Sequence, residues 1–161
     1  MSSADTILIE TSCWPLVVMD APPRLTSAGI TTLIRSVNEL YARRERFATL
    51  VDTARVEHMP TAAERRMLSE WQTETVDLIR RYNVCTATVV SNPLVRGAMI
   101  AMNWIFRPPN EQVTVATFGE ALAFCGRQLK ADGLALPSVL EAELLKPSAR
   151  NVAELLARRS A

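Results

Sequence analysis

The feature that most constrains this chain is the alternation of short apolar runs with longer stretches of helical periodicity. FATLVD at residues 47–52 is continuously apolar up to its last residue, and with CTATVV at residues 85–90 it predicts strands buried on both faces of a sheet. Around these runs, apolar residues recur at spacings of three and four, the period of an amphipathic helix. Strands that alternate with helices predict right-handed crossovers and a largely parallel sheet.

Further strands complete this sheet and define its limits. TILIE at residues 6–10 and PLVVMDA at residues 15–21, separated by TSCW, predict a hairpin, and QVTVATF at residues 112–118 predicts a last strand. The predicted order is ββαβαβαβα, an α/β domain whose mixed, mostly parallel sheet of about five strands is covered by helices. We place this domain at residues 5–130. A C-terminal helical extension at residues 134–161 carries an apolar stripe that either packs back on the sheet or docks onto another chain.

Capping residues mark where the helices begin. Thr26 or Ser27 can cap the first helix, and Asn92 is placed to cap the third. Thr117 and Glu120 have the spacing of a capping box before the last helix. The second helix is expected to be continuous and to bury one stripe, formed by Met67, Leu68, Trp71, Leu78, Ile79 and Tyr82.

Composition and charge exclude several classes of protein. A chain of 161 residues that is 48% hydrophobic is long enough for one domain with a core. The 18 Lys and Arg balance 17 Asp and Glu, so we expect no general affinity for nucleic acid. No apolar stretch approaches the roughly 20 residues of a membrane span, and the start lacks the features of a secretory signal, so we expect a cytoplasmic protein. Three cysteines without CxxC spacing predict buried thiols, and we expect no metal and no cofactor.

The stretch after residues 47–52 is the most suggestive for function. Asp52 stands at the end of a strand, where α/β folds place functional groups, and the polar loop that follows carries the only histidine, His58. One carboxylate and one histidine without a GxSxG motif do not complete a catalytic set, so we expect no enzyme. Asp20 ends another strand, but the sequence leaves its distance from Asp52 open.

Three motifs in a fixed order point to a family. LVDTARVEHMP at residues 50–60 ends a strand, SNPLVRGAMIAMNWIF at residues 91–106 opens a helix, and VATFGEALAFCGRQL at residues 115–129 forms a last strand and helix. With these motifs in this order, the chain resembles the SpoIIAA-like branch of the STAS domain superfamily, the fold of bacterial anti-sigma factor antagonists. The resemblance covers residues 5 to about 130 and implies a regulatory protein–protein interaction module in bacterial signalling.

The resemblance also implies that the loop after Asp52 contacts a protein partner. Antagonists carry an Asp-Ser-Ser-Gly signature there, whose second serine is phosphorylated, and the corresponding residue here is Ala62. Thr61 keeps a hydroxyl one place earlier; it forms a capping box with Glu64, and a phosphoacceptor role is the alternative. Self-association through the opening hairpin or the C-terminal extension is a further expectation. The expected contact residues are Asp52, Thr53, Arg55, Glu57, His58 and Thr61.

A methionine-rich cluster in the third helix supports a second hypothesis. This helix is apolar around most of its circumference, which favours core packing. Flexible methionines also adapt to varied apolar ligands, so the alternative is a pocket that binds or carries a lipid or another apolar small molecule. The residues of that pocket would be Met99, Met102, Trp104, Ile105 and Phe106.

Overall fold

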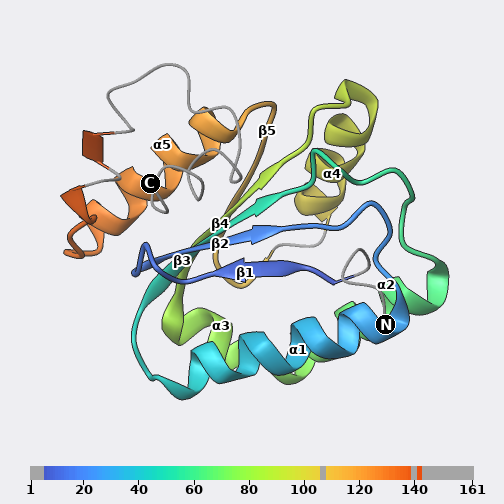
Figure 1. Cartoon of the computed structure of the whole chain (residues 1–161), viewed down its shortest axis with the longest axis horizontal. Helices are drawn as coiled ribbons and strands as arrows, with labels where there is room; N and C mark the ends of the chain where they lie inside the picture. Colours follow the sequence, from blue (N-terminus) through green and yellow to red (C-terminus); the bar gives the residue numbers. More distant parts are fainter. Residues whose placement is uncertain (1–5, 106–107, 139–140, 143–161) are drawn as a thin grey trace, which may run out of the picture.

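The predicted α/β architecture is confirmed. The computed structural model describes residues 6–105, 108–138 and 141–142, and these form one five-stranded sheet with helices packed on it (Figure 1). The order of the strands in the sheet is their order in the chain, β1 to β5. The sheet is mixed because the opening hairpin is antiparallel, whereas the later pairs of neighbouring strands are parallel.

The strands occupy the apolar runs that the sequence indicates. β1 (Leu8–Glu10) pairs antiparallel with β2 (Leu16–Asp20), as the hairpin prediction requires. β3 (Phe47–Asp52), β4 (Asn83–Val89) and β5 (Glu111–Val115) follow in parallel register. All four parallel strands therefore end at one edge of the sheet, which we call the carboxyl edge.

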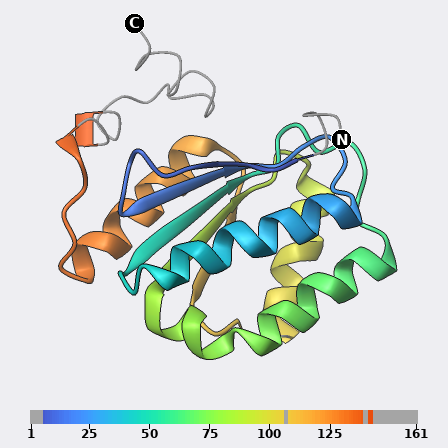
Figure 2. The same ribbon diagram turned by 60° about the horizontal axis from the view of Figure 1, so that its bottom comes forward.

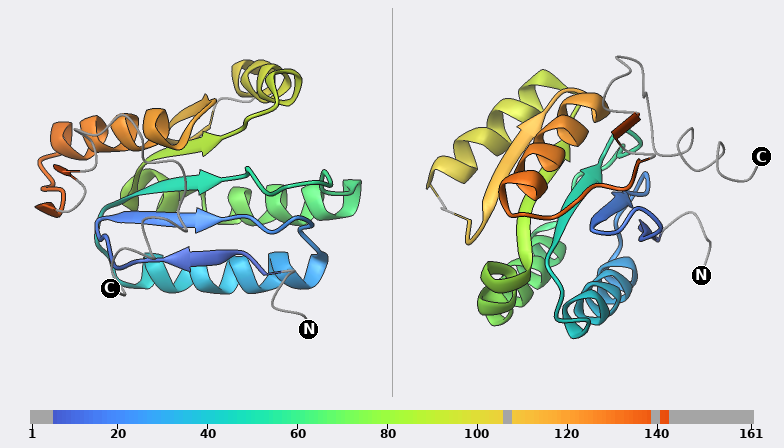
Figure 3. Two further views of the ribbon diagram at one scale, coloured as in Figure 1. Left: turned by 45° about the horizontal axis from the view of Figure 1, so that its top comes forward. Right: turned by 90° about the vertical axis from the view of Figure 1, so that its left-hand side faces the viewer.

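The helices divide between the two faces of the sheet. Each parallel connection advances by one strand in the same direction, so crossovers of the usual right hand carry their helices over one face. The last helix, α5, lies on the face opposite α1 and α3 (Figure 3), while α1 and α2 run side by side (Figure 2). The helices are α1 (Ser27–Ala42), α2 (Ala62–Glu74), α3 (Val76–Tyr82), α4 (Pro93–Ile105) and α5 (Phe118–Ala131).

Two hydrophobic cores follow from the alternation of side chains along each strand. On one face, Leu50 and its neighbours on β2 and β4 pack against α5. On the other, Val17, Met19 and Phe47 pack against α1 and α3. The three cysteines are buried free thiols, as predicted; Cys85 and Cys125 lie in the α5-side core.

The helix caps are confirmed, but the second helix is not continuous. The Thr26 hydroxyl accepts a hydrogen bond from the amide of Gly29, and the Asn92 Oδ1 accepts one from the amide of Leu94. The prediction of a single second helix is wrong, because the helix is interrupted at Thr75, between α2 and α3. The break shifts the buried stripe, so Leu78 is 39% exposed instead of packed in the core.

None of the helices in the described part of the chain combines the length and the apolar composition that crossing a bilayer requires.

Candidate functional site

Two aspartates meet at the carboxyl edge of the sheet. Asp20 and Asp52 end the adjacent parallel strands β2 and β3 and are direct partners in the register. Each lies two residues beyond a core residue, Val18 and Leu50, so alternation places both side chains on the face that α5 covers. Asp52 is buried, with 4% of its surface exposed, and the Asp20 side chain is 17% exposed. The structure thus brings together two carboxyl groups whose separation the sequence leaves open.

The surroundings of Asp52 favour its neutral form. Burial raises the pKa of this carboxyl above its ordinary value of 3.8, and the negative charge of Asp20 raises it further. The amide of Ala54, which donates to Asp52 Oδ1 over 2.9 Å, and the guanidinium of Arg55 both act to lower the pKa. The bond to Ala54 spans two residues, as in an Asx turn, so the side chain of Asp52 shapes the start of the loop.

Arg55 reaches back from the loop to Asp20. Its Nη2 lies 3.0 Å from Asp20 Oδ2, and its Nε donates to Asp20 Oδ1 over 3.2 Å. A two-pronged pair of this kind fixes the orientation of the guanidinium as well as its position. Half of the Arg55 side chain remains exposed, so the pair is screened by solvent and its main effect is to orient the loop.

The backbone of the loop at residues 53–61 is tied to its neighbours along its length. At its start, the amide of Thr53 donates to the Val89 carbonyl on β4 over 3.2 Å, and the Thr53 hydroxyl donates to the same oxygen. In its middle, the amides of Glu57 and His58 donate to the Pro23 carbonyl over 2.9 and 3.2 Å. Val56 is partly buried against the core on the α1 side. The loop therefore has one defined path along the carboxyl edge.

Side chains of this fixed loop are nevertheless exposed. Arg55, Glu57, His58 and Thr61 all face solvent, whereas Thr53 is partly buried and Asp52 lies beneath the loop. Met59, which sequence analysis did not single out, is 62% exposed. The only available signal for Met59 was an apolar residue between His58 and Pro60 in an otherwise polar loop.

The end of the loop is locked by the predicted capping box. The Thr61 hydroxyl accepts a hydrogen bond from the Glu64 amide over 3.3 Å, and Glu64 Oε2 accepts one from the Thr61 amide over 2.7 Å. The amide and the hydroxyl of Thr61 hold the pKa of Glu64 below its ordinary value. Capping by Thr61 is thus confirmed, and its role as a phosphoacceptor stays a prediction.

The neighbouring strand ends are satisfied by their own local bonds. Arg96 Nη1 donates to the Val90 carbonyl over 2.8 Å and to that of Ser91 over 3.3 Å. Beyond β5, the Thr117 hydroxyl caps α5, and Glu120 Oε2 accepts hydrogen bonds from the Thr117 amide and hydroxyl. These hydrogen bonds satisfy polar groups of the carboxyl edge beside the loop.

The side chains of the predicted apolar pocket lie outside the part of the chain that the structure describes. This applies to Met99, Met102, Trp104 and Ile105 on α4 and to Phe106 after it. Of the described side chains on α4, Leu94 is 84% exposed and Ile100 is 42% exposed.

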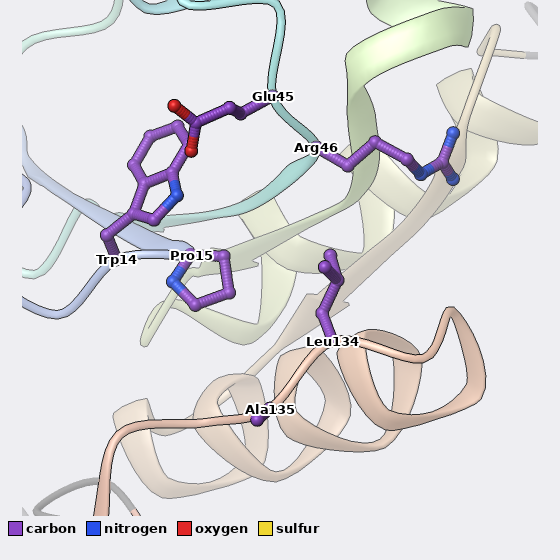
Figure 4. A pocket seen from close by; sticks show the side chains of 6 residues that line it. All are labelled: Trp14, Pro15, Glu45, Arg46, Leu134 and Ala135. Carbon is purple, nitrogen blue, oxygen red and sulfur yellow. The ribbon is translucent and has the colours of Figure 1, made fainter.

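The structure has a hollow at the opposite edge of the sheet, which the sequence did not indicate (Figure 4). It has a volume of about 340 Å³, and it is open to solvent. Trp14 contributes an aromatic wall, with the Arg43 guanidinium 4.8 Å from the centre of its ring. The hollow is lined by Trp14, Pro15, Glu45, Arg46, Leu134 and Ala135.

The described residues were compared with the requirements of a metal site, and the chain was compared with known proteins. Within the described ranges, no three His, Cys, Asp or Glu side chains gather closely enough to hold a metal ion. Comparisons with protein-family models, with curated proteins and with solved structures found no match to this chain.

Proposed function

We propose that the chain is a non-enzymatic, regulatory protein–protein interaction module of STAS type in bacterial signalling. Its contact surface would be the loop at residues 53–61 and the start of α2. The observation that carries this proposal is the contrast within the loop between a backbone pinned to Pro23 and Val89 and side chains that face solvent.

A pinned loop favours recognition because it is ordered before a partner arrives. Association must offset the loss of freedom of every group that becomes fixed, and a loop already held by hydrogen bonds loses less. Here the Asp20–Arg55 pair, the bonds to Pro23 and the capping box each restrict a different part of the loop. The exposed Arg55, Glu57 and His58 then supply charge and hydrogen-bonding groups at fixed positions.

The carboxyl pair supports binding better than acid–base catalysis. A catalytic pair needs one carboxylate poised toward a substrate, with its partner group in a matching role. Asp20 instead engages the guanidinium of Arg55, and Asp52 accepts the amide of Ala54 in its own loop while remaining buried. Both carboxyl groups thereby act on the shape of the loop.

The test replaces the exposed loop residues and measures the affinity for a protein that binds the wild-type chain. The partner is isolated from the organism that encodes the chain and purified, and its Kd is measured by calorimetry. We expect Arg55→Ala, Glu57→Ala and His58→Ala together to weaken binding by about tenfold or more, since truncating interface residues removes both contacts and water exclusion.

A matched control carries the same kinds of substitution away from the loop. Asp77→Ala, Arg80→Ala and Gln72→Ala remove one acid, one base and one neutral polar side chain from exposed positions on α2 and α3. The control should bind as the wild-type chain does. Unchanged affinity in the loop variant, or equal loss in both variants, would contradict the proposed contact surface.

The hollow supports a second candidate function, the binding of an apolar small molecule. Its walls include Trp14, Pro15 and Leu134, so the contact with a ligand would be largely apolar. Native mass spectrometry of freshly purified protein tests this candidate. A retained small molecule that disappears in the Leu134→Arg variant would support it, and a bare mass for the wild-type chain would count against it.

A further inference from the structure

Met59 is a large apolar residue that is exposed to solvent, on a loop whose backbone is held by hydrogen bonds. Its neighbours on both sides are anchored: the amide of His58 donates to the Pro23 carbonyl, and the carbonyl of Pro60 accepts a hydrogen bond from Arg65 Nη1 over 2.7 Å. Its side chain is 62% exposed. An exposed thioether on a rigid backbone is suited to fill an apolar pocket of another molecule.

Two arginines near Met59 have no ion-pair partner in the described part of the chain. Arg24 lies beside it because the backbones of Arg24 and His58 form a parallel β-bridge, and Arg65 contacts Pro60. The nearby Glu64 does feel the charge of Arg24, but its carboxylate is held mainly by the amide and hydroxyl of Thr61. Arg24 and Arg65 are both exposed.

Two other arginines close to this surface do have carboxylate partners. Arg55 is paired with Asp20, and Arg66 is paired with Glu70 over 2.7 Å. The charges of Arg55 and Arg66 are therefore largely neutralised within the chain. Among the described residues, no ion pair neutralises those of Arg24 and Arg65, so both are available to a partner. Glu57, also exposed on the loop, is a nearby carboxylate that such a partner has to tolerate.

We propose that this surface docks onto an acidic patch of a protein, in which Met59 enters an apolar pocket and carboxylates at its rim pair with Arg24 and Arg65. The inference rests on the proposed interaction function and adds the chemistry of the partner. Complementary charges around an apolar anchor steer association and set orientation. A single methionine flanked by two cations and an acid is a small footprint, suited to a protein pocket instead of a nucleic acid backbone, which needs several phosphate contacts.

The first step of the test identifies the partner through position 59 itself. The photoreactive residue p-benzoylphenylalanine is placed at position 59 and, as a control, at position 78, where Leu78 is exposed on α3. Both chains are expressed in the organism that encodes them, irradiated and recovered with any attached protein. We expect an adduct from position 59 and none from position 78. The absence of an adduct at position 59 would contradict both the proposed function and this inference.

The second step measures the affinity of the purified partner for folded variants, with folding checked by circular dichroism. We expect Met59→Ala to weaken binding by about tenfold, and Arg24→Glu with Arg65→Glu by about thirtyfold or more, since like charges would then face each other. Glu57→Gln should bind as well as the wild-type chain or more tightly. The loss caused by added salt, from about 50 to 300 mM, should be smaller in a variant with Arg24→Gln and Arg65→Gln.

The outcomes separate this inference from the proposed function. A partner that binds the loop but is unaffected by charge reversal at Arg24 and Arg65 would overturn the acidic partner and leave the interaction function standing. Arg80→Glu with Leu78→Ala serves as the matched control and should retain wild-type affinity. Adsorption of the wild-type chain to vesicles of phosphatidylserine and phosphatidylcholine, lost on charge reversal, would overturn the inference in favour of a lipid surface.

Discussion

At the scale of single residues, the buried side chain of Asp52 helps to set the conformation of the loop that follows it. Strand β3 places the Asp52 carboxyl group at the carboxyl edge, next to Asp20 on β2. Two adjacent negative charges in a buried environment are unfavourable. Arg55 relieves the repulsion by pairing with Asp20, and Ala54 supplies a hydrogen bond to Asp52. The start of the loop is thus determined by how its own residues satisfy the two carboxyl groups.

The raised pKa of Asp52 gives a pH dependence of stability with a definite sign. The folded chain holds the proton of Asp52 more tightly than the unfolded chain does, so ionisation costs stability as the pH rises above the ordinary value of 3.8. Asn at this position cannot ionise and can still accept the Ala54 amide. We expect Asp52→Asn to raise the Tm at pH 7 relative to the wild-type chain, with a difference that shrinks toward pH 4.

Thermal unfolding followed by circular dichroism between pH 4 and pH 8 checks this expectation. Asp77→Asn is the control, because the Asp77 side chain is 93% exposed and its replacement should leave the pH profile unchanged. A lower Tm for Asp52→Asn at pH 7 would mean that the folded protein stabilises the charged carboxylate, against the argument from burial.

At the scale of elements, local signals placed the helix starts but not the interruption of the second helix. Thr26, Thr61, Asn92 and Thr117 cap their helices as predicted, because a cap depends on residues that are close in sequence. At the break, the Thr75 hydroxyl donates to the Trp71 carbonyl over 2.7 Å, a bond to the preceding turn of the kind that often bends helices, and Thr75 is buried. After the break, Ile79 and Tyr82 reach the core and Leu78 does not.

The capping box at the start of α2 should contribute measurably to stability. Thr61→Ala removes the acceptor for the Glu64 amide, and loss of a cap of this kind costs about 1 kcal/mol. Urea unfolding of the variant gives the change in the free energy of unfolding. Thr73→Ala, in the last turn of the same helix, is the matched control and should cost less, since alanine is the best helix former. Equal costs at the two positions would show that the box adds no stability.

At the scale of the whole molecule, the two edges of the sheet carry different structural features. The carboxyl edge carries the pinned loop, and the opposite edge carries the hollow around Trp14. That opposite edge is held by Arg46, whose guanidinium pairs with Asp132 over 2.6 Å and donates to the Arg81 carbonyl over 2.9 Å. One side chain thus joins the connection after α1 to the last turn of α3 and to the residue after α5, which are far along the chain from one another.

The segment after α5 belongs to this core in its first residues. Gly133, with a φ of 81°, lets the chain turn at the end of α5, and Leu136 then lies 6% exposed in the α5-side core. Leu136 stands beyond residue 130, where the sequence suggested that the domain ends. Its burial shows that the first part of the predicted extension packs against the α5-side core.

Replacing Leu136 measures how much this segment contributes. We expect Leu136→Ala to lower the free energy of unfolding by about 2 to 4 kcal/mol, because it removes buried methyl groups and leaves a cavity. Leu94→Ala is the matched control: the same change at a side chain that is 84% exposed should cost about 0.5 kcal/mol or less. Urea unfolding of both variants gives the comparison. A small effect at Leu136 would place it outside the cooperative unit.

The sequence by itself determined the strands and the helix caps, because period and capping act over a few residues, and the alternation of strands with helices predicted a largely parallel sheet. The tertiary structure alone decided that Asp20 and Asp52 are neighbours, that Arg24 stands beside the loop, and that Met59 is exposed. These facts depend on strand register and on contacts between distant segments, such as the bond from His58 to Pro23. No local pattern encodes such contacts, since their free energy is gained only when the whole sheet has formed.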